Sequence, residues 1–280
     1  MEEQNKTQGP IGVFDSGYGG LTILDEIRKE LPEYDYLYLG DNARSPYGTR
    51  SFDVVYKYTL ECVEYLFHRG CHLVILACNT ASAKALRTIQ QNDLPKIDAN
   101  RRVLGVIRPT VEEVGKLTHT NHVGLLATSG TVQSDSYPLE IQKIFPAVKV
   151  VSQACPMWVP LIENNEHNTK GADFFIQKYV GELMKADNLI DTVILGCTHY
   201  PIISEQIKKA LPTTEIKVVS QGELVAKSLK DYLHRHPEVE MKCSKGRKAH
   251  YLTTENLNKF SSSASIFLSE DIQAEHIEVG

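Results

Sequence analysis

Short apolar runs alternate with segments of helical spacing along most of the chain. The apolar runs have the length of buried strands and occupy residues 11–14, 36–39, 73–77, 103–107, 123–127, 148–151 and 193–195. Apolar residues recur at helical spacing over residues 21–31, 51–69, 81–91, 110–117, 174–185 and 204–211. Strands that alternate with helices form parallel sheets, because the helices act as crossover connections. The pattern therefore predicts the α/β class.

The sequence also resembles itself in two places. Residues 11–17 (IGVFDSG) are similar to residues 123–129 (VGLLATS), and residues 72–80 (HLVILACNT) are similar to residues 191–199 (DTVILGCTH). Short strand-turn patterns of this kind also converge by chance. Because the two pairs occur in the same order, we interpret them as a duplicated α/β unit.

A duplicated unit predicts two pseudo-symmetric lobes, each a mainly parallel sheet flanked by helices. We expect residues 1–104 and 218–280 to form the first lobe and residues 105–217 to form the second. Parallel sheets bind ligands beyond the carboxyl ends of their strands, so the ligand site is expected in the cleft between the lobes. Cys78 and Cys197 then occupy equivalent positions on opposite walls of that cleft.

The C-terminal part of the chain has a different pattern. Residues 234–248 (HRHPEVEMKCSKGRK) are polar and interrupted by proline, which predicts a surface loop. A strand over 249–253 and a helix over 256–268 are expected to follow and to rejoin the first lobe.

Composition and charge exclude some classes of binding partner. The net charge is -5, and neither a nucleic acid nor an anionic membrane surface is expected as a partner, because both favour a concentrated excess of Lys and Arg. No apolar run approaches the roughly 20 residues that cross a bilayer. The N-terminal MEEQNKTQGP is polar and acidic where a secretory signal is basic and then apolar, so we expect a cytoplasmic protein with a small-molecule ligand.

Two of the six cysteines are candidates for a chemical role. The chain has no Cys-x-x-Cys pair, so reduced thiols are expected, with neither a disulfide framework nor a metal site. Cys78 and Cys197 each directly follow a predicted strand, and Cys78 also precedes a predicted helix, whose N-terminus favours the thiolate. Alone, each would be read as a small buried residue, but their parallel settings favour a chemical role. The remaining cysteines are interpreted as structural or incidental: Cys62, Cys71, Cys155 and Cys243.

Turn-rich segments follow other predicted strands. Residues 15–20 (DSGYGG) begin with Asp15 in the first lobe and open a helix, so their N–H groups are suited to an anion. The segment lacks the third glycine of a dinucleotide-binding loop, which makes that ligand the weaker alternative. Residues 41–48 (DNARSPYG) are either a plain connection or a lid, and residues 128–131 (TSGT) place Thr131 at the corresponding position of the second lobe.

Taken together, these segments resemble one family. VFDSGYGGLTIL, YLGDNARSPYG, ILACNTASA, LLATSGTVQSDSY and ILGCTHYP resemble glutamate racemase segments, in order and over nearly the whole chain. The Cys-Thr-His of residues 197–199 resembles glutamate racemases more than the related aspartate racemases, which usually have an acidic residue after Cys-Thr. The chain departs from the pattern at Arg108, where many members of the family carry Glu.

The resemblance implies a cofactor-independent glutamate racemase that supplies D-glutamate for peptidoglycan synthesis, in a homodimer. It implies that Cys78 takes the α-proton from D-glutamate and Cys197 takes it from L-glutamate. Asp15 and His199 are implied to lie beside the thiols and set their protonation, and Glu163 matches a position with a supporting role. The implied substrate-binding residues are Asp15, Ser16, Tyr47, Gly48, Asn79, Thr80, Thr131, Thr198 and His199, with Thr128 as a lesser candidate.

Physical chemistry supports a pair of thiols for this reaction. Inverting a Cα centre requires a base on one face and an acid on the other. A free thiol has a pKa of about 8.5, so one member of a pair can be thiolate while the other stays protonated. The α-proton is a very weak acid, and without a cofactor the developing charge must be met by preorganised donors.

Three alternatives remain at this point. One is a racemase of the same superfamily that acts on aspartate or a hydantoin. Another is a cysteine hydrolase in which His199 activates Cys197. Against it, residues i and i+2 of a strand-like segment point to opposite faces, and Cys78 has no role. The third is a binding module without turnover.

Overall fold

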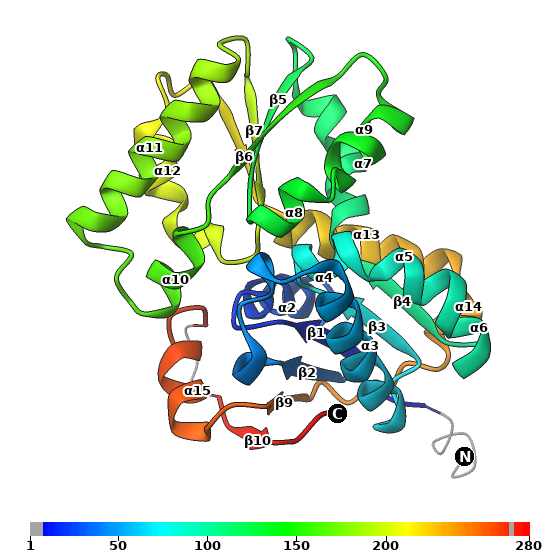
Figure 1. The fold of residues 1–280 in the computed structure, drawn as a ribbon. Coiled ribbons are helices and arrows are strands. Elements are labelled where there is room, and N and C mark those ends of the chain that lie inside the picture. The colour runs from blue at the N-terminus through cyan, green and yellow to red at the C-terminus, as the bar shows by residue number, and fades with distance from the viewer. Residues whose placement is uncertain (1–7, 269–271) are drawn as a thin grey trace.

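The structure, a computed structural model, describes residues 8–268 and 272–280. Residues 1–7, which form most of the segment used above to argue against a secretory signal, lie outside the described residues. Figure 1 shows two lobes, one built from the N-terminal and C-terminal parts of the chain and the other from the middle part. The α/β class predicted from the sequence is confirmed.

The first lobe contains a six-stranded sheet with the order β10-β9-β2-β1-β3-β4. Its elements are β1 (Ile11–Asp15), α2 (Gly20–Glu30), β2 (Tyr36–Gly40), the 3-10 turns η1 (Asn42–Arg44) and η2 (Tyr47–Thr49), α3 (Phe52–His68), β3 (Leu73–Leu76), α4 (Asn79–Lys84), α5 (Leu86–Thr88), the π turn η3 (Ile89–Asp93), α6 (Leu94–Ile97), β4 (Arg102–Gly105), α13 (Gly222–Arg235), α14 (Pro237–Glu240), β9 (Ala249–Thr253), α15 (Leu257–Ala264) and β10 (Ala274–His276).

The second lobe contains a four-stranded sheet with the order β6-β5-β7-β8. Its elements are α7 (Ile107–Leu117), β5 (His122–Ala127), α8 (Ser129–Gln133), α9 (Ser136–Ile144), β6 (Lys149–Ala154), α10 (Trp158–Glu163), α11 (Lys170–Ala186), β7 (Thr192–Gly196), the 3-10 turn η4 (Tyr200–Ile203), α12 (Ser204–Ala210) and β8 (Lys217–Val219).

The two sheets share one topology. Every strand pair in both sheets is parallel, and β2-β1-β3-β4 has the same order as β6-β5-β7-β8. The two sequence similarities match β1 to β5 and β3 to β7, which are corresponding strands of this order. The topology therefore agrees with a duplicated unit. The exact division of the chain into lobes stays a prediction, and its boundary after residue 217 falls inside β8.

The C-terminal region differs from the expectation. The loop expected over residues 234–248 is wrong in part, because α13 extends to Arg235 and α14 follows it. Cys243 is buried, and its neighbour Ser244 donates its N–H to the carbonyl of Gly9 at 2.8 Å. Helix α13 was not expected at all, although its buried residues recur with helical spacing.

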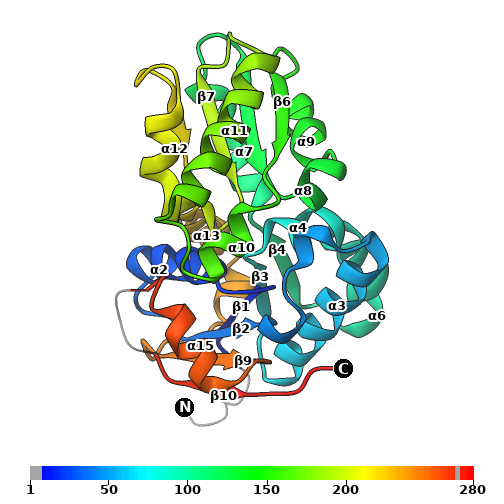
Figure 2. The same cartoon turned by 60° about the vertical axis from the view of Figure 1, so that its left-hand side comes forward.

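The lobes are packed against each other at several places. One apolar cluster contains buried residues of both sheets, from Ile11 in β1 to Leu195 in β7. Helix α13 packs against α2 of the first lobe and α7 of the second. Helix α4 of the first lobe contacts α8 of the second. Figure 2 shows α4 and α8 facing each other where the lobes meet. The carboxyl ends of both sheets thus meet in one region.

Candidate active site

A cavity of about 60 Å³ lies where the carboxyl ends of the strands of both lobes meet. Asp15 ends β1, Cys78 follows β3, Thr128 follows β5, and Cys197 follows β7. Ten of the predicted site residues line the cavity: Asp15, Ser16, Tyr47, Gly48, Cys78, Asn79, Thr80, Cys197, Thr198 and His199. The tertiary structure therefore brings the two cysteine-bearing segments to one site.

Cys78 caps the N-terminus of α4 within the first lobe. Its Sγ accepts the Ala81 N–H at 3.4 Å and lies 3.2 Å from the Ser16 hydroxyl. The pKa of the Cys78 thiol is nevertheless raised to about 12, first by burial and second by the nearby Asp15 carboxylate. The N-terminus of α4 thus lowers the pKa of Cys78, as the sequence predicts, but the cost of desolvating the anion exceeds the gain from two hydrogen bonds.

Asp15 is buried beside Cys78. Burial raises the pKa of its carboxyl above the ordinary value, while His199 and the N–H groups of Gly20 and Gly17 act in the opposite direction. The Gly17 N–H donates to Asp15 Oδ2 at 2.9 Å. The carboxyl is thus oriented by the backbone and placed to influence the charge of the Cys78 thiol.

Cys197 has a different environment, dominated by a histidine. Its Sγ lies 3.8 Å from His199 Nδ1, and His199 Nε2 lies 2.9 Å from Glu163 Oε1. Burial alone would lower the pKa of His199, but hydrogen bonds to Cys197 and Glu163 raise it well above the ordinary value. The raised pKa favours the protonated imidazolium, which would place a positive charge beside the second thiol.

This contact corrects an argument made from the sequence. Cys197 and His199 were expected to point to opposite faces, as residues i and i+2 do in a strand. Strand β7 ends at Gly196, so both residues lie in the turn before η4 and their side chains meet. The ring of His199 also lies close to Gly19, which precedes α2 of the first lobe. A Cβ on Gly19 would lie 2.3 Å from His199 Nδ1, so this position requires glycine.

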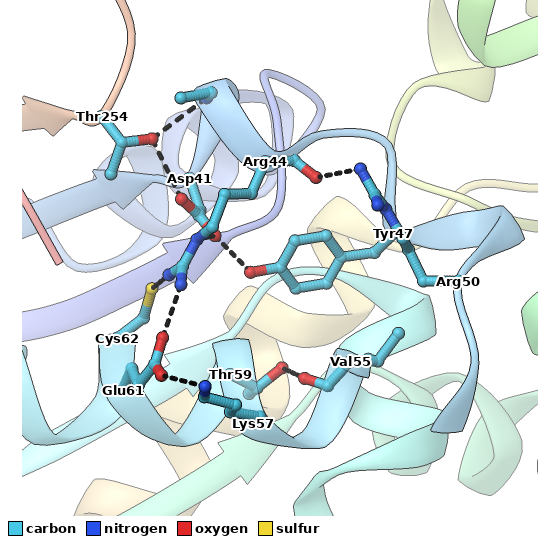
Figure 3. Close-up of polar contacts among 11 residues, drawn as sticks. Asp41, Arg44, Tyr47, Arg50, Val55, Lys57, Thr59, Glu61, Cys62 and Thr254 are labelled. Atoms are coloured by element: carbon cyan, nitrogen blue, oxygen red, sulfur yellow. Dashed lines mark hydrogen bonds and ion pairs between the residues drawn. The ribbon is translucent and has the colours of Figure 1, made fainter. Parts of the chain in front are cut away.

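Tyr47 contributes to the cavity wall but not through its hydroxyl. Figure 3 shows the phenol directed toward Asp41, whose carboxylate accepts its hydrogen bond. Arg44 donates to the same carboxylate at 2.7 Å, and Thr254 donates to its other oxygen at 3.0 Å. This partly buried cluster holds the segment that carries Gly48 in place. Tyr47 therefore lines the cavity with its ring and backbone, and Gly48 lines it with its backbone.

Hydroxyl groups of both lobes meet on another wall. Thr80 Oγ1 lies 3.0 Å from Thr128 Oγ1, and Thr128 Oγ1 lies 3.1 Å from Thr131 Oγ1. Thr128 and Ser129 line the cavity, whereas Thr131 lies behind Thr128 and does not. Thr128, treated above as the lesser candidate, is thus better placed than Thr131 to contact a ligand.

Several lining residues were not named individually as site residues from the sequence, although some lie in the segments 41–48 and 128–131. They are Ser45, Pro46, Thr49, Ser129, Cys155, Pro156, Val159 and Pro160. Cys155, interpreted above as incidental, directly follows β6, so its position at a strand end was a usable signal. Arg108 is away from the cavity on α7, where it pairs with Glu112 and Glu140. Among the described lining residues there is neither Lys nor Arg, so N–H groups, hydroxyls and the imidazole of His199 would have to bind an anion.

Comparisons with known proteins agree on one family. A model of the Asp/Glu/Hydantoin racemase family matches residues 19–229. The chain is 41% identical over 275 residues to a glutamate racemase of Ruegeria sp., covering 95% of this chain and 98% of that protein.

Solved structures show the same likeness. A glutamate racemase isoform of Bacillus anthracis superposes with a TM-score of 0.87 at 32% identity, covering 97% of this chain and 98% of the other. A glutamate racemase of Francisella tularensis, in complex with D-glutamate, superposes with a TM-score of 0.85 at 33% identity, covering 97% of this chain and 98% of the other.

Proposed function

Because the chain belongs to the Asp/Glu/Hydantoin racemase family, we propose that it interconverts L- and D-glutamate through proton transfer by two cysteines. The observation that carries the proposal is the presence of Cys78 and Cys197 in one cavity, each within two residues of the end of corresponding strands in the two lobes. The likeness to glutamate racemases over nearly the whole chain supports glutamate as the substrate.

In the proposed mechanism each thiol faces one side of the substrate Cα. Cys197, beside the cationic His199, takes the proton from L-glutamate, while Cys78, whose raised pKa keeps it protonated, delivers a proton to the opposite face. In the reverse direction Cys78 is the base. The charge of Asp15 raises the pKa of this thiol, so Asp15 would support the step as the acceptor of the thiol proton. The supporting observation is that each thiol has a different charged partner.

The substrate is proposed to be held by the remaining predicted residues. The carboxylates and ammonium group would contact hydroxyls and N–H groups of Ser16, Tyr47, Gly48, Asn79, Thr80, Thr128 and Thr198. Thr131 would act through its contact with the Thr128 hydroxyl. Several of these residues lie at starts of helices, where N–H groups lack partners within the helix and favour anions. The same donors would stabilise the charge that develops when the α-proton leaves.

The protein is expected to racemise glutamate without pyridoxal phosphate, metal or nucleotide. The measurement is circular dichroism of L- and D-glutamate, or deuterium uptake at Cα, with purified protein dialysed against chelator and hydroxylamine. Activity lost on dialysis and restored by an added cofactor would contradict the cofactor-free chemistry. A parallel panel with aspartate and a hydantoin tests the alternative substrates of the family.

One observation favours a second candidate. Glu163, His199 and Cys197 form a chain of contacts of the kind that activates a thiol nucleophile for hydrolysis. The hydrolase still gives Cys78 no role. Hydrolysis of glutamine or a glutamyl amide in the absence of racemisation would support it over the racemase.

Three further statements belong to the proposal. The product is D-glutamate for peptidoglycan synthesis, the location is the cytoplasm, and the assembly is a homodimer; all three are supported by the family resemblance. Within the part of the chain that the structure describes, no helix has the length and apolarity needed to cross a membrane. Sedimentation equilibrium, which separates the mass of one chain from that of two, tests the dimer.

A further inference from the structure

Three side chains behind the cavity form a closed ring of hydrogen bonds. Asn79 Nδ2 donates to Gln221 Oε1 at 2.6 Å, Gln221 Nε2 donates to the Tyr137 hydroxyl at 2.7 Å, and that hydroxyl donates to Asn79 Oδ1 at 2.7 Å. We call this the Asn79–Tyr137–Gln221 ring. Each of the three residues is at most 2% exposed. Each of the three side chains therefore donates one hydrogen bond and accepts another within the ring, away from water.

The ring joins parts of the chain that no single element connects. Asn79 begins α4 in the first lobe, and Tyr137 lies in α9 of the second. Gln221 lies in the connection from β8 back to α13. Its Nε2 also lies 3.2 Å from the carbonyl oxygen of Val106, in the connection from β4 to α7. One carboxamide thus contacts both chain connections between the lobes.

The ring also restricts the residue next to the first thiol. Asn79 follows Cys78 directly and lines the cavity, whereas Gln221 and Tyr137 do not. A buried amide without partners is unfavourable, so the Asn79 side chain has one satisfied orientation, turned toward the second lobe. The backbone at residues 78–79 is thereby tied to the position of the other lobe.

We propose that Gln221 is a positioning residue for the reaction, because its carboxamide closes the ring that fixes Asn79, and with it Cys78, relative to the lobe that carries Cys197. This inference rests on the proposed function. Proton transfer between two thiols through one Cα requires both sulfurs at a fixed separation, and displacements of about 1 Å cost on the order of 100-fold in rate. Gln221 acts through this geometry and not by contact with the substrate.

The test replaces the ring members one at a time and together. Gln221→Met keeps an unbranched side chain of similar length but removes the carboxamide, and Tyr137→Phe removes only the hydroxyl. We expect each to lower kcat/KM for both enantiomers by on the order of 10- to 100-fold. Because both break the same ring, the double variant should lose little more than the more impaired single variant.

A matched control makes the same chemical change elsewhere. Tyr36 is buried in the first lobe, and its hydroxyl donates to the carbonyl of Leu31 at 2.6 Å. Tyr36→Phe therefore removes a buried phenol hydrogen bond at a distance from the cavity. Its kcat/KM should stay within about twofold of the unaltered protein, whereas that of Tyr137→Phe should not.

A second readout does not depend on racemisation. The rate at which each cysteine reacts with a thiol reagent is measured by peptide mass spectrometry, without substrate. Gln221→Met should accelerate labelling of Cys78 and Cys197, which lie in the cavity between the lobes, and leave Cys62 and Cys71 in the first-lobe core unchanged. A merely destabilising substitution would accelerate all four.

Each outcome decides the inference. Unchanged kcat/KM together with unchanged labelling of Cys78 overturns it, as does equal acceleration of all four cysteines. If Gln221→Met does not fold, Tyr137→Phe is judged by the same criteria. If the unaltered protein does not racemise glutamate, the proposed function fails, and labelling alone decides whether the ring positions the two thiols.

Discussion

Replacing either Cys78 or Cys197 with alanine is expected to lower racemisation by on the order of 10³- to 10⁴-fold, because each thiol serves as acid or base on its own face of Cα. One thiol can still remove a proton, but the intermediate then lacks a donor on the far side. Cys71→Ala is the matched control, since Cys71 is a buried thiol in the core of the first lobe. It should affect stability but not turnover.

A partial reaction separates the roles of the two thiols. Elimination of a leaving group from a β-substituted amino-acid analogue needs only proton removal. Cys78→Ala should therefore retain elimination from the L-analogue, where Cys197 is the base, and Cys197→Ala should retain it from the D-analogue. The two-thiol assignment is wrong if both variants lose both eliminations equally, or if either still racemises substantially.

The pH profile of racemisation should be bell-shaped. The rate rises with pH as one thiol becomes the base and falls as the other ceases to be an acid, with apparent pKa values that belong to the pair. Burial, which raises the pKa of the Cys78 thiol to about 12, should keep Cys78 protonated through the neutral range in the absence of substrate. A rate independent of pH between about 6 and 10 would contradict two titrating thiols.

The second large effect is expected from His199→Gln. His199 contacts Cys197, and hydrogen bonds to Cys197 and Glu163 raise its pKa, so the substitution removes a group placed to carry positive charge beside the Cys197 sulfur. Elimination from the L-analogue should fall by on the order of 100-fold, and elimination from the D-analogue by less than about tenfold. The assay is the initial rate of elimination with each analogue at saturating concentration.

Asp15→Asn serves as the counterpart on the other side of the site. Asp15 lies beside Cys78 and is the proposed acceptor of its proton, so this substitution should slow elimination from the D-analogue more than from the L-analogue. Racemisation itself cannot show the difference, because enantiomers have equal free energies and any variant changes kcat/KM equally in both directions. If each variant slows elimination from the L-analogue and from the D-analogue to the same extent, the assignment of His199 to Cys197 and of Asp15 to Cys78 is wrong.

Much of this molecule follows from local patterns in the chain. The apolar runs predict the strands β1, β2, β3, β5 and β7, because a strand buried on both faces is apolar at successive positions. The parallel topology follows from the alternation of strand and helix. Cys78 and Cys197 were found for the same reason, since chain order alone places them after strands, where parallel sheets have their sites.

The tertiary structure decided what those residues experience. Burial outweighs the helix N-terminus at Cys78, the turn after β7 brings His199 onto Cys197, and Asp41 takes the hydroxyl of Tyr47. None of these three properties follows from the apolar periodicity of a strand or a helix. Desolvation and side-chain contacts depend on every element packed around a group.

The Asn79–Tyr137–Gln221 ring is the clearest example of a feature that the sequence does not predict. Its members are 58, 84 and 142 residues apart in pairs. The sequence determines which segments become strands and helices, since apolar periodicity reports the buried face of each element. It does not report which polar atoms meet once two lobes close on each other, because those contacts exist only in the packed arrangement of all their elements.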